Sequence, residues 1–406
     1  MPIRLDKIPP LAPRPQRPRF LLWLGTLLLF CLLGIGGTLL FGDESLPLRP
    51  SDFWPLALGI PFLVWCVLGF GRVLIYVGQQ GVADGWDGAR EKDLHGKMRR
   101  GRRSQQVLGV SVQTALAEPA DDPEMQLDAL LSGATVLKSQ ASRMSGATVR
   151  HSALSCDADE SPEAILLSIW AQTLADLTPT LAQLPDDQPL ALLLDVDTGL
   201  PEQQWYRVWQ QAWRESGIRQ PISPVDGRGL TALDQWLDQR IADRELLLVL
   251  ALQFAPQRPE GTAEVAVGLL FGNRLTQATL APIAYLHRPE QALKPTSEDL
   301  LYATRQAHEW VPLESRPIEQ VWRAGIDVRG AGAIAEVLVE NSLSGNKPGL
   351  RDLDAMVGHP GCASPWLAVA AGAQAIRRGA GSQFIFSGGA VAAGLWGTVL
   401  IPASSL

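Results

Sequence analysis

The sequence predicts two membrane-spanning helices followed by a layered α/β domain. The chain has 406 residues, which is more than one hydrophobic core usually supports, so two or more structural units are expected. Apolar residues dominate the chain before about residue 80, whereas the composition after about residue 105 is that of an ordinary globular protein. In this second region, short apolar runs alternate with helical patterns, which is typical of an α/β fold.

Two long apolar segments make up the first region. Residues 20–41 contain no charge, and at about 1.5 Å per residue they would span the roughly 30 Å hydrocarbon core of a bilayer. A cleaved signal peptide would have a shorter apolar region, and here a second segment follows at 53–77. The one charge of that second segment, Arg72, lies near its end, where the side chain can reach the membrane interface. We therefore expect a transmembrane hairpin over 20–78, in preference to two buried core helices.

Basic residues flank this hairpin on both outer sides, while the loop between the helices contains only Arg49. The flanking basic residues are Arg4, Lys7, Arg14, Arg17 and Arg19 before the hairpin, and Arg90, Lys92, Lys97, Arg99, Arg100, Arg102 and Arg103 after it. The positive-inside rule therefore predicts a bacterial inner-membrane protein with both termini in the cytoplasm. The cluster at 99–103 is basic enough to contact anionic lipid, although a plain topology signal is the preferred explanation.

Each region beyond the hairpin has its own pattern. The proline-rich residues 1–19 cannot form a helix and are expected to be a flexible cytoplasmic tail. Residues 79–106 are expected to form a basic juxtamembrane helix or linker, and 107–406 the α/β domain. In that domain we expect helices at 161–178, 202–216, 229–242, 297–309 and 333–340, a loop entering an alanine-rich helix at 358–376, and strands at 107–116, 190–196, 244–254, 263–272, 326–328, 384–389 and 395–401.

The order of these segments resembles the thiolase-like fold, specifically the β-ketoacyl synthases. The resemblance covers 190–406 well and 107–190 loosely, and its most specific motif is Gly358-His359 leading into an apolar helix. The four matching segments are 226–253, 263–272, 357–376 and 384–401. They resemble, in order, the elbow and helix that carry the nucleophile, the strand that follows, the loop with the second active-site histidine, and the closing glycine-rich loop with the final strand.

The resemblance implies a site that lacks most of its reactive groups. In ketosynthases a cysteine thiolate at a helix N-terminus attacks an acyl thioester, and two histidines assist. The position of that cysteine falls at about Asp226, and the segment expected to hold the first histidine, 339–350, has none. The usual lysine position holds Asp354, and only His359 matches the family. A carboxylate cannot accept an acyl group as a thioester, so the resemblance implies a domain that has lost condensing activity.

The sequence contains three other candidate sites. Cys362 lies three residues after His359, so a nucleophile pair is conceivable, but a small buried residue is the simpler interpretation. Cys156 stands in an acidic context that would raise its pKa and lower its reactivity. A dinucleotide-binding pattern is formed by Gly330, Gly332 and Ala335, with Asp352 about 20 residues later. The histidines and cysteines show no metal spacing, and we expect neither a metal nor a cofactor.

The preferred functional hypothesis is a membrane-tethered, non-catalytic scaffold or adaptor. The net charge of −7 argues against nucleic-acid binding. Expected partners are membrane lipid and a protein, either a thiolase-like protein, an acyl carrier protein or a secretion effector, in a homo- or heterodimer. Residues 86–103 also resemble small membrane proteins that accompany type VI secretion effector clusters. The alternatives are a condensing-type acyltransferase that uses Cys362 or Asp226 with His359, and an acyl- or lipid-binding module.

Overall fold

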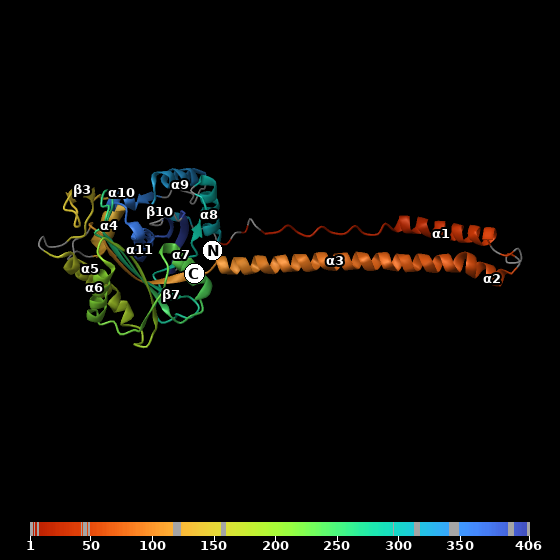
Figure 1. Cartoon of the computed structure of the whole chain (residues 1–406), viewed down its shortest axis with the longest axis horizontal. Helices are drawn as coiled ribbons and strands as arrows, with labels where there is room; N and C mark the ends of the chain where they lie inside the picture. Colours follow the sequence, from red (N-terminus) through yellow and green to blue (C-terminus); the bar gives the residue numbers. More distant parts are fainter. Residues whose placement is uncertain are drawn as a thin grey trace. The chain divides into compact units, whose positions relative to one another are not determined.

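Two compact units make up the chain. One comprises residues 4–97, and the other comprises Met1–Ile3 with Met98–Leu406 (Figure 1). The computed structural model describes the chain except for residues 1–2, 4, 6–7, 42, 44–46, 48, 117–122, 156–159, 295, 312–316, 341–348, 389–393 and 404–406.

The first unit contains two helical segments that are long and apolar enough to cross a membrane. Their elements are α1 (Phe20–Phe41), and then α2 (Pro50–Trp54), a π-helical turn η2 (Pro55–Gly59) and α3 (Ile60–Gly101). The sequence predicted separate helices at 53–77 and 79–105, but α3 covers most of both ranges as one helix. No proline occurs between Pro61 and the end of α3, so nothing in the sequence interrupts its hydrogen bonds.

The proline-rich segment before α1 makes specific contacts with α3. Its described residues 8–19 are not helical, and they contact α3, whereas we expected a free tail. Arg14 forms an ion pair with Asp87 at 2.7 Å. The carbonyl oxygen of Pro9 accepts a hydrogen bond from Nε of Arg90 at 2.7 Å. Proline residues keep a segment extended while leaving its carbonyl oxygens free to accept such bonds.

A single mixed sheet forms the centre of the second unit. Its spatial order is β11, β10, β12, β13, β8, β1, β7, β6, β4 and β5, and β9 pairs with β13. In the same order the strands are Gly349–Asp352, Ile318–Ala324, Ser382–Ser387, Trp396–Pro402, Ala284–His287, Ser104–Gln113, Val265–Asn273, Leu246–Phe254, Leu190–Thr198 and Ile222–Pro224, with β9 at Glu290–Gln291. Strands β2 (Lys138–Ala141) and β3 (Thr148–His151) form a separate hairpin.

The strand order shows that the domain is a structural duplication. From the centre outwards, β1-β7-β6-β4-β5 matches β8-β13-β12-β10-β11. The matching pairs also share direction, because β4 is parallel to β6 as β10 is to β12, while β7 and β13 are antiparallel to those partners. The halves join where β1 pairs with β8 in antiparallel fashion. No sequence repeat revealed this symmetry, because corresponding strands share topology and not residues.

Helices cover the sheet in layers. One outer layer packs on the half formed by β1, β7, β6, β4 and β5. A second outer layer packs on the half formed by β8, β13, β12, β10 and β11. A central layer is enclosed between the inner faces of the two halves. The outer helices are α5 (Pro162–Leu181) with α6 (Glu202–Glu215), and α8 (Ser297–Glu309) with α9 (Val328–Glu340). The central layer contains α7 (Gly229–Gln239), α11 (Ser364–Arg377) and α4 (Pro123–Ser132), while α10 (Leu353–Val357) and the 3₁₀ turn η3 (Gly361–Ala363) precede α11. The layered α/β class predicted from the sequence is confirmed.

The central helix α11 explains why its sequence is rich in alanine. Every residue from Ser364 to Ile376 is buried, so no face of the helix meets water. A helix enclosed on all sides is apolar all round, and small side chains let the flanking layers approach. The helix at 229–242 and the strands at 190–196 and 244–254 were placed correctly within a few residues, and the predicted loop and helix at 358–376 correspond to η3 and α11.

A buried ionic cluster lies where β8 and β9 meet α7. Arg288 is fully buried and forms ion pairs with Asp234 at 2.6 Å and Asp238 at 2.7 Å. Nearby, Glu290 accepts a hydrogen bond from Nε1 of Trp310 at 2.6 Å. Burial raises the pKa of Glu290 to about 7, and the Trp310 bond and the charge of Arg288 only partly oppose that rise. Glu290 therefore holds a proton in the folded protein at pH values where the unfolded chain has lost it.

The free energy of unfolding should consequently fall as pH rises from 4.5 to about 7. Glu290→Gln removes this titration, so the variant should match the wild type near pH 4 and exceed its stability at pH 8 by roughly 3 kcal/mol. Denaturant unfolding at several pH values measures the effect. Glu336→Gln, an exposed change on α9, is the matched control, and equal pH profiles for wild type and Glu290→Gln would contradict the assignment.

Candidate functional site

The sequence-predicted residues lie near the N-termini of the two central helices. Helix α7 begins at Gly229, directly after Asp226, Gly227 and Arg228, and α11 begins at Ser364, after the loop that contains His359 and Cys362. The turn η3 before α11 contacts β4 and β6. Segments from both halves of the duplicated fold therefore meet at this point.

The elbow before α7 has the tight geometry that the resemblance implied. Gly227 has a φ of 140° and Gly229 a φ of 50°, and a Cβ on Gly227 would lie 2.7 Å from Cβ of Ala232. Glycine is required at both positions for these reasons. Asp226, at the position where the resemblance expected the cysteine, is exposed on this elbow.

The sequence did not single out Asp195, which is the central polar residue of the site. Its Oδ2 accepts hydrogen bonds from the amide of Gly229 at 2.8 Å and from Nε1 of Trp366 at 3.1 Å. The residue is only 2% exposed, and burial raises its pKa even though both bonds oppose the rise. The first amide of α7, where the resemblance expected the nucleophile, is therefore bound to a carboxyl group of the chain itself. The only sequence signal for the importance of Asp195 was its place as an acidic residue at the end of the apolar run 190–196.

The thiol of Cys362 is buried and forms hydrogen bonds with the main chain. Its Sγ donates to the carbonyl oxygens of Asp195 at 3.2 Å and Leu252 at 3.3 Å, and the residue is 4% exposed. Burial raises the pKa of the thiol well above its ordinary value, and the carboxylates of Asp195 and Asp197 raise it further. Since the thiolate is the reactive form, Cys362 is poorly suited to act as a nucleophile.

His359 is half-buried and bonds within its own loop. Its Nδ1 accepts from the amide of Gly361 at 3.1 Å, and its carbonyl oxygen accepts from Nε2 of Gln253 at 2.9 Å. Gly361 has a φ of 54°, and a Cβ there would lie 1.4 Å from Oε1 of Gln253. Among the described residues, neither hydrogen bond of Cys362 goes to His359. His359 and Cys362 are therefore close in sequence, but no hydrogen bond described in the structure joins their side chains.

Asp354, at the position where the resemblance expected lysine, stabilises a turn. Its two carboxylate oxygens accept from the amides of Gly325 at 2.8 Å and Ile326 at 2.9 Å. Burial raises the pKa of Asp354, and these bonds and the charge of His359 oppose that rise. The residue fixes the connection between β10 and α9, which accounts for an acid at this position.

The dinucleotide-binding interpretation of the glycine pattern is wrong. Gly330, Gly332 and Ala335 all lie inside α9, and the strand that precedes the helix is β10, which ends at Ala324. The strand predicted at 326–328 is instead a connection that leads into the helix. A phosphate-binding pattern needs its glycines in the turn between strand and helix, where the amides are free.

Two further sequence predictions fall on residues outside those described. Cys156 is one of them, and most of 339–350, where the first histidine was expected, is the other. Within the described residues, no group of three or more His, Cys, Asp or Glu side chains is placed to hold a metal ion.

The predicted membrane-flanking arginines have two kinds of environment. Arg17, Arg19, Arg99, Arg100 and Arg102 are exposed. Arg103, in contrast, donates to the carbonyl oxygen of Leu237 at 2.6 Å and lies 3.5 Å from Asp238. Arg103 is therefore bound to α7 and is not free to contact a lipid headgroup.

Comparison with known proteins supports the fold and no closer relationship. No family model matches the sequence, and no curated protein matches it. Among solved structures, PfaC keto synthase-chain length factor matches with a TM-score of 0.51 and 10% identity, over 74% of this chain and 43% of that chain. The ketosynthase from module 1 of the bacillaene synthase from Bacillus amyloliquefaciens FZB42 matches with a TM-score of 0.49 and 11% identity, over 75% and 76% of the two chains. The domain has a thiolase-like, ketosynthase-like fold, as the sequence resemblance implied.

Burial of Cys362 leads to a labelling prediction. In the folded protein Cys362 should resist iodoacetamide at pH 8, and it should react once the chain is denatured, because the buried thiol stays protonated. Mass spectrometry of the peptide that contains Cys362 measures the modified fraction. Asp226→Cys introduces a thiol on the exposed elbow and should be modified rapidly without denaturant. Rapid modification of Cys362 in the native protein would contradict the assignment.

Asp195 leads to a stability prediction. Asp195→Ala leaves the amide of Gly229 and the indole N–H of Trp366 without their acceptor, which should cost about 2–4 kcal/mol of unfolding free energy. Asp195→Asn keeps an acceptor oxygen and removes the buried charge, so its loss should be under about 1 kcal/mol. Urea unfolding compares the two variants with Asp197→Ala, an exposed control on the same strand. Equal losses for Asp195→Ala and Asp195→Asn would refute a hydrogen-bonding role.

Proposed function

We propose that this chain is a membrane-anchored, non-catalytic ketosynthase-like adaptor at the cytoplasmic face of a bacterial inner membrane. The observation that carries the proposal is the occupation of the α7 N-terminus by Asp195. The free amides of a helix N-terminus can stabilise an anion, and here the first of them, that of Gly229, is bound to the side chain of Asp195. No thiolate or oxyanion can use the same amide without displacing it.

The remaining reactive groups support the loss of condensing activity. The elbow residue Asp226 is a carboxylate, and the thiol of Cys362 donates to two carbonyl oxygens in a buried position. His359 is bonded to the amide of Gly361. Asp226 has the wrong chemistry for a thioester, Cys362 is buried and hydrogen-bonded, and His359 has only its Nε2 left to offer a ligand, whereas the surrounding fold is intact. A fold retained without its chemistry favours a binding role.

The hairpin supports the anchoring part of the proposal. Helix α1 has 22 residues, and its apolar side chains are exposed to the surroundings. Such a surface needs a lipid environment. Exposed arginines at both outer ends of the hairpin, among them Arg17, Arg19, Arg99 and Arg100, favour a cytoplasmic location for both termini.

The adaptor would bring a soluble partner to the membrane. Candidate partners are a thiolase-like protein, an acyl carrier protein or a secretion effector, and a role beside type VI secretion effectors belongs to this proposal. Homo- or heterodimerisation by sheet extension is disfavoured at one edge, because β5 has only three residues and ends in Pro224, which lacks an amide hydrogen. Partner contacts are therefore expected on helices and loops.

The test combines partner capture with an activity assay on the full chain. The tagged protein, extracted from membranes in detergent, should retain a specific soluble protein of one of the three classes, identified by mass spectrometry. Another two-helix membrane protein with the same tag is the control. Cys362→Ala should retain the same partner, because the thiol has only a structural role.

An acyl-thioester condensation assay supplies the opposing outcome. The wild-type chain should form no condensation product from an acyl thioester and a malonyl thioester. Product formation that Cys362→Ala abolishes would establish an enzyme and refute the non-catalytic proposal. Capture of no specific soluble protein would refute the adaptor role.

A further inference from the structure

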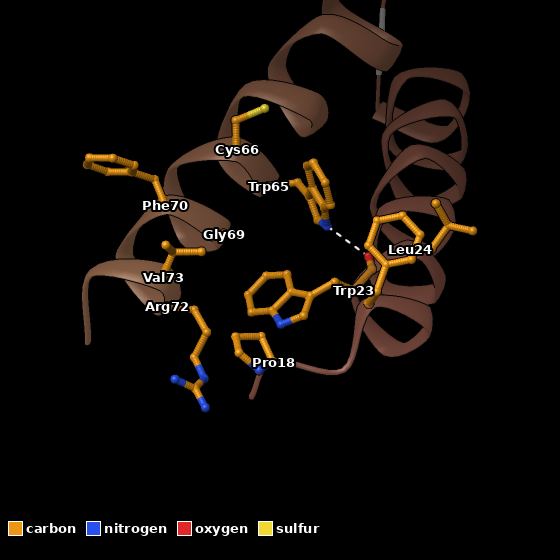
Figure 2. Close-up of a pocket in the computed structure, with 10 residues that line it drawn as sticks. Pro18, Trp23, Leu24, Trp65, Cys66, Gly69, Phe70, Arg72 and Val73 are labelled. Atoms are coloured by element: carbon orange, nitrogen blue, oxygen red, sulfur yellow. Dashed lines mark hydrogen bonds between the residues drawn. The ribbon is translucent and has the colours of Figure 1, made fainter. Parts of the chain in front are cut away.

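The membrane hairpin contains a cavity that opens beside a charge. It lies between the start of α1 and the first third of α3 and has a volume of about 350 Å³. Its lining is almost entirely apolar and includes Trp23, Leu24, Trp65, Phe70 and the guanidinium-bearing Arg72 (Figure 2). Ligand pockets commonly measure roughly 300–1,000 Å³ and combine apolar walls with a few polar groups.

Two tryptophans form a fixed wall of this cavity. Nε1 of Trp65 donates to the carbonyl oxygen of Trp23 at 3.0 Å and to Oγ1 of Thr26 at 3.2 Å. The two indole rings meet edge to face, with centroids 6.4 Å apart. The space beside them is open because residue 69 is glycine, whose missing Cβ would lie 4.0 Å from the Trp23 ring. The hydrogen bonds of Trp65 therefore fix one wall of the cavity, and the Trp23 ring packs against it.

Two hydrogen-bond donors remain free at the mouth. Figure 2 shows the indole nitrogen of Trp23 and the guanidinium of Arg72 on the side of the cavity where Pro18 lies. Among the described residues, neither donor has a hydrogen-bond acceptor. No acidic residue occurs between Asp52 and Asp84, so this stretch of chain supplies no counter-charge to Arg72. A cation in a low-dielectric environment is costly unless an anion accompanies it.

We propose that this cavity binds one anionic glycerophospholipid from the cytoplasmic leaflet. The phosphate is held by Arg72 and the Trp23 indole N–H, and one acyl chain lies against Trp23, Trp65 and Phe70. A planar guanidinium binds phosphate through two parallel hydrogen bonds. A net-negative headgroup neutralises Arg72, whereas a zwitterionic phosphoethanolamine brings its own cation. The inference rests on the proposed membrane insertion and topology, which place this end of the hairpin next to the anionic leaflet.

Native mass spectrometry of the full-length chain in detergent, titrated with phosphatidylglycerol or phosphatidylethanolamine, tests the inference. Wild type should bind one phosphatidylglycerol more tightly than phosphatidylethanolamine. Arg72→Gln should weaken phosphatidylglycerol binding about fivefold, whereas Arg19→Gln, an exposed basic residue at the same end, should change it little. Gly69→Leu should fill the cavity and lower binding of both lipids, whereas Gly71→Leu, which does not line it, should not.

Three outcomes would overturn the inference. Equal affinity for the two lipids would show that charge does not select the occupant. Equal effects of Arg72→Gln and Arg19→Gln would show a diffuse surface attraction instead of a site. Release of the chain from membranes by alkaline carbonate would refute the proposed hairpin, and the lipid site with it. If the chain stays in membranes after carbonate treatment but binds the two lipids equally, the result supports the membrane hairpin and refutes only the lipid site.

Discussion

A buried carboxylate connects the two central helices of this domain, and the organisation of the site depends on it. The side chain of Asp195 accepts from the first amide of α7 and from the indole of Trp366 on α11, while its main-chain carbonyl accepts from Cys362. Helix α7 belongs to one half of the duplicated fold and α11 to the other. One residue therefore holds together elements from both halves of the thiolase-like fold.

The elements that sequence patterns predicted well are those whose burial is uniform. The continuous apolar runs of β4 and β6 and the alanine-rich α11 are enclosed on both sides, so each pattern has one interpretation. Strand β10 was missed because Glu319 and Arg323 interrupt its apolar residues, and the neighbouring glycines were taken for a turn. Those glycines lie in α9, where packing against the domain overrides their weak helix propensity.

The site could be located from sequence only as far as local motifs reach. The glycine elbow and the loop of His359 were found by resemblance, and both lie at helix N-termini. The role of Asp195 was not predictable, because its two hydrogen-bond donors are 34 and 171 residues away in the chain. Arg103 illustrates the same limit, since a basic cluster next to a membrane helix gives no sign that one member binds the end of α7.

The close approach of Gly361 to Gln253 constrains how this domain can change over evolution. Any side chain at position 361 would occupy the space of the Gln253 amide, which binds the carbonyl oxygens of Ala263 and His359. A mutation at either position alone would disturb the loop before α11, so the two positions are expected to covary among homologues. A sequence that keeps this pair while its elbow residues diverge would be under selection for the architecture of the loop and not for the chemistry of the elbow.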